Sequence, residues 1–289
     1  MDKVVEYYKL AKKKYDAGGS PFDEILLLTK SCYDVIGRNF SKIDYSHKEK
    51  HGQYFVFYKG KDRSRPVNKR LFVSTYEDLK PLWNDLLEGE ISGFKSAGEV
   101  KGIVDSVIYS VISVFSVCYD IEKKGSRKTP GTFFEVLLGS LLAEALPGYE
   151  RTKFIAIPDQ VEKVSTDIVF DKDGAGVVIP AKITTRERVV QPYAHQRILD
   201  SVFGKGRYKS VLMCVSETQA DHTNEVVNDI CVPGTIRLFQ NHLSELSAIY
   251  YLDPPERYMQ ADLQSIIKVS TYNELFSGGL RSITNALDS

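Results

Sequence analysis

Hydrophobic residues in the first third of the chain recur first with a helical period and then with a strand period. Residues 3–38 have the helical period, interrupted by a Gly-Gly-Ser-Pro break at residues 18–21, and predict two successive helices. Residues 52–75 alternate in the manner of two strands around a basic loop, and residues 76–87 return to the helical period. The chain up to about residue 98 is therefore predicted to be an α+β region.

The middle of the chain contains two strongly apolar segments. Residues 103–119 include Asp105 and several serines and are slightly short for a membrane span, so we expect a buried helix or strand there. Residues 130–146 form an apolar helical pattern that begins after Thr129, a favourable helix cap, and stops at Pro147-Gly148. The second segment is predicted to be a helix with a wide apolar face.

A β-hairpin is predicted between residues 166 and 184. Two runs rich in β-branched residues flank a turn with Asp173-Gly174, and an Asp-Gly pair between such runs is typical of a hairpin. A strand is predicted before it, at residues 153–158. After the hairpin the pattern predicts a helix, a fully apolar strand, a second helix and a short strand, at residues 192–203, 210–216, 222–230 and 235–239.

This order of elements predicts an α/β fold in which a central mixed β-sheet is flanked by helices. We expect two parts, although no linker rich in Pro, Gly or Ser separates them. Residues 1–98 would form the N-terminal α+β region, and residues 99–289 would form the part that contains the central sheet.

Composition and charge are those of an ordinary globular protein, with 43% hydrophobic and 26% charged residues. The 38 basic residues balance 38 acidic ones, so a polyanion would have to be bound by local basic clusters. The four cysteines are far apart, lack the spacing of a zinc site and are expected to be reduced. The N-terminal residues lack the apolar core of a secretion signal, so we expect a cytoplasmic protein without a membrane partner.

Asp167 and Lys182 are the residues that most clearly indicate chemistry. The hairpin would place them at neighbouring positions on paired strands. A carboxylate there can hold a divalent metal ion, and a lysine can orient a water toward a phosphate. A polar pair at a sheet edge is the alternative, but a lysine in an apolar strand is costly unless an acid pairs with it or it does chemistry. Glu135 could add a second carboxylate, although the helix dipole alone favours a first-turn glutamate.

These residues resemble the PD-(D/E)XK nucleases, and among them the type II restriction endonucleases. The family pattern is a helix with Glu, a strand with Asp, a hairpin, and a strand that ends in acid-X-Lys. The corresponding segments are TPGTFFEVLLGSLLAEAL with Glu135, STDIVF with Asp167 and VVIPAKI with Lys182. The resemblance covers residues 129–216 and implies that Asp167 and Glu135 bind Mg²⁺ while Lys182 acts in catalysis. A literal Pro-Asp pair ends at Asp159, but we favour Asp167 because it borders the strand that pairs with the lysine strand.

The chain departs from the family pattern at Pro180, which stands where the family usually has Asp or Glu two residues before the lysine. Some restriction endonucleases carry that acid on the helix after the lysine strand. The resemblance therefore offers Glu187 and Gln196 as alternatives for this catalytic position, and neither is a clean match. His195 lies beside Gln196, but a lone histidine on a half-buried helix is expected to be structural.

Two groups of residues are candidates for DNA contact, and each has a plain structural alternative. Arginine suits bidentate hydrogen bonds to guanine or phosphate, although a solvated turn with an internal Arg–Glu pair would have the same sequence. The first group follows the lysine strand and comprises Arg186, Arg188, Gln191 and Arg197, with Tyr193 and Gln196 on the same polar surface. The second could lie along a phosphate backbone, or could be an ordinary basic loop, and comprises Lys59, Lys61, Arg63, Arg65, Lys69 and Arg70.

The predicted function is that of a type II restriction endonuclease: Mg²⁺-dependent, site-specific hydrolysis of double-stranded DNA that leaves 5′-phosphate and 3′-hydroxyl ends. A homodimer is expected, because a two-fold symmetric protein can recognise a palindrome and cut both strands, with residues 1–98 serving recognition or dimerisation. Two alternatives remain: another PD-(D/E)XK nuclease of the repair or resolvase type, and a non-catalytic DNA-binding protein on the same fold. A plasmid digest separates them by discrete fragments, a smear, or a gel shift without cleavage.

Overall fold

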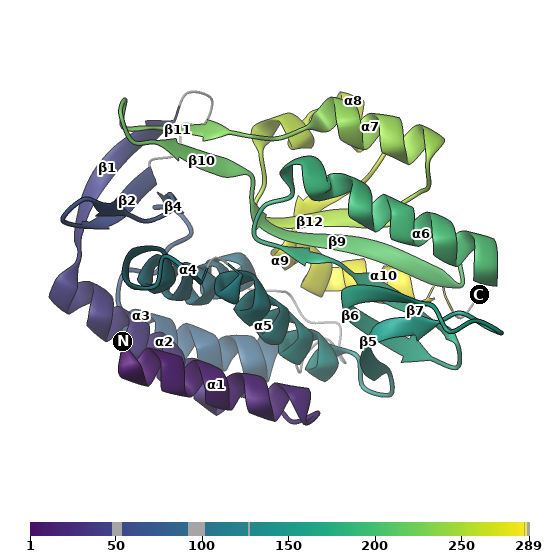
Figure 1. Cartoon of the computed structure of the whole chain (residues 1–289), viewed down its shortest axis with the longest axis horizontal. Helices are drawn as coiled ribbons and strands as arrows, with labels where there is room; N and C mark the ends of the chain where they lie inside the picture. Colours follow the sequence, from purple (N-terminus) through teal and green to yellow (C-terminus); the bar gives the residue numbers. More distant parts are fainter. Residues whose placement is uncertain (48–53, 92–101, 127, 286, 288–289) are drawn as a thin grey trace. The chain divides into compact units, whose positions relative to one another are not determined.

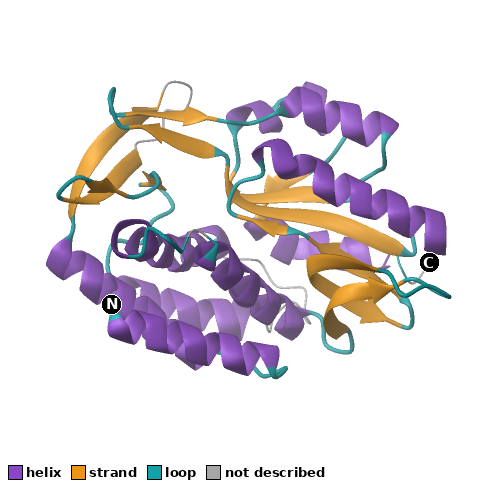
Figure 2. Ribbon diagram, in the orientation of Figure 1, coloured by secondary structure: helices purple, strands orange, loops and turns teal. Residues whose placement is uncertain are grey.

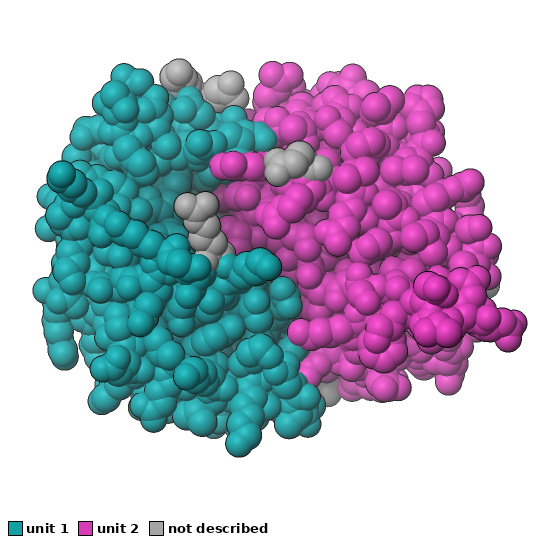
Figure 3. All heavy atoms as spheres, viewed as in Figure 1, with its two compact units in different colours: residues 1–90, 101–140, 218–230 teal, residues 91–100, 141–217, 231–289 magenta. Residues whose placement is uncertain are grey.

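The chain folds into two compact units (Figure 3). Unit 1 consists of residues 1–90, 101–140 and 218–230, and unit 2 of residues 91–100, 141–217 and 231–289. The structure is a computed structural model, and it describes residues 1–47, 54–91, 102–126, 128–285 and 287. Each unit has its own β-sheet and helices, which confirms the predicted α/β class (Figure 2). Unit 1 combines the N-terminal region with two segments from later in the sequence.

Unit 1 is built around a helix that is buried along nearly its whole length, α4 (Val104–Glu122). Its length and hydropathy would allow it to cross a membrane, but 89% of its apolar stretch is buried within the fold, so it is a core helix. On α4, Phe115 packs against Phe133 with ring centroids 4.3 Å apart. The predicted break at residues 18–21 separates two helices, as expected, and the helices before α4 are α1 (Asp2–Asp16), α2 (Phe22–Asn39), α3 (Tyr76–Asp85) and η1 (Leu86–Ile91).

The sheet of unit 1 joins strands from two distant parts of the sequence, residues 41–68 and 218–229 (Figure 1). Its order is β10-β11-β1-β2-β3, with β4 also paired to β2. The helix predicted at residues 222–230 is wrong, because Asp221 accepts backbone hydrogen bonds from Thr223 and Asn224 and so closes a turn between two strands. The second strand predicted within residues 52–75 is also wrong: residues 69–75 after the basic loop are turn and irregular, and the two-residue strands β3 and β4 lie within the loop itself. The strands are β1 (Ser41–His47), β2 (Tyr54–Lys59), β3 (Asp62–Arg63), β4 (Val67–Asn68), β10 (Thr218–Asp221) and β11 (Val226–Asp229).

Unit 2 contains the predicted mixed sheet, with seven strands in the order β13-β12-β9-β7-β6-β5 and with β8 beside β9. β5, β6 and β7 are antiparallel, whereas β7, β9, β12 and β13 are parallel. The hairpin turn at Asp173-Gly174 has φ of 55° and 72°, the two left-handed conformations that an Asp-Gly hairpin turn requires. The strands are β5 (Glu150–Ala156), β6 (Lys163–Lys172), β7 (Ala175–Ile179), β8 (Ala181–Lys182), β9 (Tyr208–Ser216), β12 (Ala248–Asp253) and β13 (Val269–Thr271).

Helices cover the sheet of unit 2, and one prediction there is wrong. Residues 235–239 belong to a helix, α7, rather than a strand, because Pro233 starts a helical turn and Ile236 packs into the core below it. Leu212 and Cys214 of β9 face the same core cluster. The helices are α5 (Thr129–Ala145), which continues from unit 1, η3 (Arg186–Val189), α6 (Val190–Phe203), α7 (Pro233–His242), η4 (Glu256–Met259), α8 (Ala261–Gln264), α9 (Tyr272–Glu274), η5 (Leu275–Gly279) and α10 (Leu280–Asn285).

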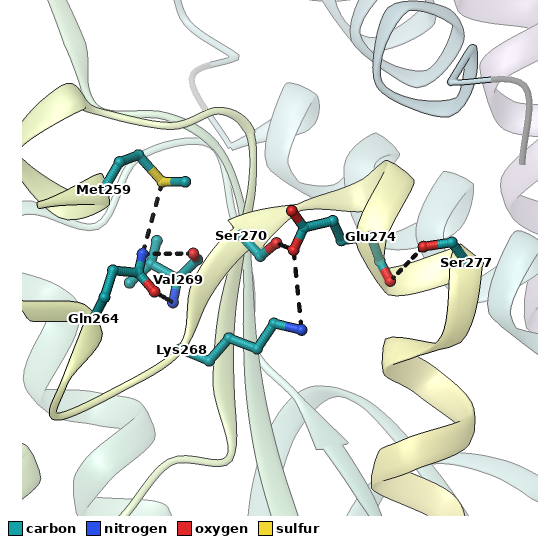
Figure 4. A network of polar contacts seen from close by, with 7 residues as sticks. All are labelled: Met259, Gln264, Lys268, Val269, Ser270, Glu274 and Ser277. Carbon is teal, nitrogen blue, oxygen red and sulfur yellow. Dashed lines mark hydrogen bonds and ion pairs between the residues drawn. The ribbon is translucent and has the colours of Figure 1, made fainter. Parts of the chain in front are cut away.

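Side chains complete the hydrogen bonding of the edge strand β13 (Figure 4). The Gln264 amide donates to the Val269 carbonyl at 2.7 Å and accepts from the Val269 N–H at 3.3 Å. Beyond it, Ser270 donates to Glu274, and Lys268 lies 3.9 Å from the same carboxylate. An edge strand satisfied in this way presents fewer open backbone groups to other chains.

Candidate active site

Asp167 and Lys182 are in direct contact where β7 passes into β8. The Lys182 Nζ lies 2.6 Å from Asp167 Oδ2, and the same oxygen accepts a 2.8 Å hydrogen bond from the Ala181 N–H. The Lys182 and Asp167 side chains are 15% and 21% exposed, so they are shielded from bulk water but remain accessible. A charge-assisted contact in such surroundings is stronger than an ion pair on the open surface.

Pro180 explains why this contact forms. The pairing of β6 with β7 ends at Ile168–Ile179, because Pro180, the residue after β7, has no N–H to donate. The Pro180 carbonyl accepts from the Met213 N–H at 2.9 Å, and the chain then continues beside β9 alone. Once β8 has left β6, the Ala181 N–H is available to the Asp167 carboxylate. A residue that breaks the family pattern in sequence therefore shapes the site.

Two other acidic residues of the sequence pattern belong to other elements of the fold. Asp159 occupies an exposed turn after β5, with φ of 59°, whereas Asp167 contacts the lysine. Glu135 lies half-buried on α5 and belongs to unit 1. There, burial raises the pKa of Tyr8, and the negative charge of Glu135 raises it further. The structure thus brings Asp167, the favoured aspartate, to Lys182.

Gln196 is engaged in structural hydrogen bonds. Its side chain is buried on α6, where the amide nitrogen donates to the Tyr208 carbonyl at 2.9 Å and to Asp200 at 2.7 Å. The amide oxygen accepts from the Ser210 N–H at 2.8 Å. Both ends of the amide therefore tie α6 to β9, and Gln196 is not available to replace the acid missing at Pro180.

His195, which we expected to be structural, lies close enough to Asp167 and Lys182 to be affected by both charges. Burial lowers the pKa of His195, the positive charge of Lys182 lowers it further, and the Asp167 carboxylate raises it. The Nδ1 atom is buried and lacks a hydrogen-bond partner among the residues that the structure describes. Sequence pattern alone missed this residue, because its proximity to Asp167 arises from the packing of α6 on the sheet.

Comparisons with known proteins identify the family. No protein-family pattern matches the chain, and a search of the curated proteins also finds no match. Among solved structures, the chain is similar to the crystal structure of the type IIP restriction endonuclease Kpn2I, with 35% sequence identity, 99% of each chain covered and a TM-score of 0.89. The chain belongs to the type II restriction endonucleases. A second similar structure, a complex of restriction endonuclease PspGI with substrate DNA, has 15% identity, covers 73% of this chain and 92% of that one, and has a TM-score of 0.45.

The family assignment makes this restriction endonuclease a site-specific deoxyribonuclease of the PD-(D/E)XK fold. The alternatives of a repair or resolvase nuclease and of a non-catalytic binder are thereby set aside. The assignment also agrees with the position of Asp167 and Lys182 on the central mixed sheet of unit 2.

The turn after β8 presents arginines to solvent. Arg186 and Arg188 are exposed in η3, and Arg188 donates from its guanidinium to the Thr184 carbonyl at 3.2 Å. The side chain of Glu187 lies outside what the structure describes. Gln191 and Arg197 are also exposed, whereas Tyr193 is fully buried and so does not belong to the polar surface that we expected.

Three basic residues of the loop in unit 1 are paired with acids from other parts of the sequence. Arg65 forms a bidentate ion pair with Asp120, with both N···O distances at 2.8 Å. Lys59 lies 2.7 Å from Glu122. Further contacts are Lys69 with Asp44, Asp62 with Lys124, and Arg63 stacked over Tyr58 and bonded to the Gly60 carbonyl. Lys61 and Arg70 are exposed.

The donor set of the restriction endonuclease suits a hard metal ion only in part. Among the described residues, no group of three or more His, Cys, Asp and Glu side chains forms a metal-binding cluster. Asp167 supplies a partly exposed carboxylate, the ligand type that Mg²⁺ prefers. The His195 imidazole suits transition metals better. Among the described residues near Lys182, Asp167 could therefore hold a divalent ion.

Proposed function

We propose that this restriction endonuclease hydrolyses double-stranded DNA with Mg²⁺ and leaves 5′-phosphate and 3′-hydroxyl ends. Use of a divalent metal ion is general in the family. The observation that carries the proposal is the 2.6 Å contact between Asp167 of β6 and Lys182 of β8, two partly accessible, oppositely charged groups of the central sheet. Bound Mg²⁺ would polarise the phosphate and lower the pKa of a bound water.

The two residues would have different roles. The Asp167 carboxylate would hold the metal ion. The Lys182 ammonium has three N–H groups, so beyond its bond to Asp167 it can donate to the attacking water and to a phosphate oxygen. Glu135 is the proposed second carboxylate, and Glu187 remains a proposed alternative for the acid absent at Pro180. Gln196 is not proposed for this role, because both ends of its amide are hydrogen-bonded to β9.

We propose that DNA is contacted mainly by the exposed polar residues that follow Lys182. Arg186 and Arg188 are nearest in sequence to the catalytic lysine, and Gln191 and Arg197 continue along α6. In the basic loop, ion pairing reduces the charge that Lys59, Arg65 and Lys69 can offer to phosphate, so the exposed Lys61 is the stronger candidate there, and Arg70 is also exposed. A homodimer, with residues 1–98 in recognition or dimerisation, would suit a palindromic site.

The test is a plasmid digest with Mg²⁺, followed by sequencing of the fragment ends, with EDTA as the control. Asp167→Asn and Lys182→Met should lose at least about a hundredfold in cleavage rate, because each removes a group that acts on the reacting atoms. Lys205→Met changes an exposed loop lysine and should cut normally. Asp159→Asn should also cut normally. An active Lys182→Met, or an inactive Asp159→Asn beside an active Asp167→Asn, would contradict the assignment.

A further inference from the structure

Glu217 is a fully buried acid just beyond the end of β9, in a position that the cleavage chemistry does not explain. Its exposed fraction is 0%. The Oε1 atom accepts hydrogen bonds from the Thr185 N–H at 2.8 Å, from the Thr185 hydroxyl, and from the Tyr251 hydroxyl at 3.0 Å. Among the described residues, the Oε2 atom has no hydrogen-bond partner. Two of the bonds to Oε1 therefore come from one residue of the turn that follows Lys182.

Thr185 is the inner anchor of the turn that exposes the arginines. It is buried, and its carbonyl accepts from the Arg188 N–H at 2.9 Å. Arg186 has φ of 46°, a left-handed conformation that is unfavourable for a residue with a side chain. Such a conformation persists only where the surroundings enforce it. On the far side of the turn, Val189 is buried in the core cluster of unit 2. Thr185 and Val189 thus fix the two ends of the turn to the interior of unit 2.

The same strand supports Lys182 and the turn. Lys182 pairs with Cys214 of β9, and the Ser216 N–H donates to the Ile183 carbonyl at 3.1 Å. Glu217 is the next residue after Ser216, so β9 and its continuation hold Lys182, Ile183 and Thr185 in succession. Rigid, shared support of this kind keeps reacting groups and recognition groups in a constant geometry.

Burying a carboxyl group beneath a turn costs free energy, because its charged form loses its hydration. Burial raises the pKa of Glu217, and hydrogen bonds from Thr185, Tyr251 and the Arg186 backbone lower it only partly. A smaller neutral acceptor would avoid the desolvation of a charge. The carboxyl, however, accepts several strong hydrogen bonds at one oxygen and so defines the position of Thr185 closely.

We propose that Glu217 is a positioning residue for sequence discrimination: it holds Thr185, and through it the conformation from which Arg186 and Arg188 contact DNA, in register with Lys182. This inference rests on the proposed DNA contact by those two arginines. It assigns Glu217 no contact with DNA or metal.

The experiment compares Glu217→Met with Tyr251→Phe in the full-length protein. Glu217→Met removes the acceptor of Thr185, whereas Tyr251→Phe removes a bond to the same oxygen from β12 and leaves the turn anchored. Three readouts are taken: melting temperature, hydrogen–deuterium exchange of residues 183–190, and kcat and KM on a duplex with the site found by end sequencing and on duplexes with one altered base pair.

For Glu217→Met we expect faster exchange in the turn and a loss of discrimination of about tenfold to a hundredfold, the range for one misplaced bidentate base contact. The loss should appear mainly in KM for the site, with kcat changed only a few-fold, because Asp167 and Lys182 keep their contact. Tyr251→Phe should lower the melting temperature and leave exchange of the turn and discrimination unchanged. Glu217→Gln keeps one acceptor oxygen and should restore most of the discrimination.

If Glu217→Met does not fold, Thr185→Val and Glu217→Gln carry the test, with Thr185→Val expected to lose discrimination. A folded Glu217→Met or Thr185→Val that discriminates normally overturns the inference, as does a Tyr251→Phe enzyme with the same loss. Arg186→Ala and Arg188→Ala separate the two proposals. If they lose discrimination while Glu217→Met does not, only the role of Glu217 fails. If neither arginine matters, the proposed DNA contact fails first.

Discussion

Replacement of Gln196 distinguishes a structural residue from a substitute for the missing acid. Gln196→Leu keeps the volume of the side chain but leaves the Tyr208 carbonyl and the Ser210 N–H without their partner. Each buried backbone group left unsatisfied costs about 1–3 kcal/mol. Gln196, Asp200 and Tyr208 border a pocket through which water can reach part of this region. The summed cost of the two unsatisfied groups should therefore lie toward the lower end of its range. We therefore expect a loss of about 2–4 kcal/mol in the free energy of unfolding.

The assay is urea denaturation at 25 °C, with the m-value required to stay unchanged, combined with the cleavage rate at saturating Mg²⁺ and DNA. Ser201→Ala alters an exposed position of the same helix and should change stability by less than about 0.5 kcal/mol. Below its melting temperature, the Gln196→Leu enzyme should cut at nearly the normal rate. A stable variant that has lost cleavage would refute the structural role.

Gln196→Glu is a second test of whether Gln196 is structural or replaces the missing acid. If Gln196 stood in for the family's acid, a carboxylate there should improve metal-dependent cleavage. The hydrogen bonds predict the opposite, because a carboxylate cannot donate to the Tyr208 carbonyl and would lie against Asp200. We expect an enzyme less stable than the wild type with no gain in rate, and a faster enzyme would contradict this.

Three further predictions test the fold. Arg65→Met should cost about 1–2 kcal/mol in unfolding free energy, since a partly exposed bidentate pair is broken, and should leave the Kd for DNA unchanged in a gel-shift titration because that charge is already paired. Gly174→Ala should cost about 1 kcal/mol through its φ of 72°, whereas Gly37→Ala in α2 should gain about 0.5–1 kcal/mol by urea denaturation. Burial raises the pKa of the Glu217 carboxyl in the folded state, so its contribution to stability is complete below the unfolded-state pKa and is lost as the pH rises through the folded-state pKa. In Glu217→Gln the fall of stability with rising pH above about 4.5 should therefore be flatter than in the wild type. An unchanged pH profile would argue against this.

Local chemistry made much of the fold predictable. The break at residues 18–21, the helix after Thr129 and the Asp173-Gly174 hairpin depend on turn and cap residues that act within a few positions, so sequence alone locates them. The segments 222–230 and 235–239 were predicted wrongly for the opposite reason. Both are short and moderately apolar, and their conformation depends on a partner distant in sequence: β1 for β11, and the core of unit 2 for α7.

The features of the candidate site likewise fall into those that local sequence predicts and those that depend on tertiary packing. The hairpin pattern was enough to predict that Asp167 and Lys182 would lie near each other, because a short Asp-Gly turn brings the two runs side by side. Tertiary packing decided the rest: the contact between Asp167 and Lys182, the buried hydrogen bonds of Gln196, the proximity of His195 to both charges, and the anchor at Glu217. In the basic loop, likewise, the acids that neutralise Lys59 and Arg65 come from α4, distant in the sequence. Sequence by itself determined which groups could act, and tertiary structure decided which of them are free to act, because pairing and burial depend on neighbours that only folding brings together.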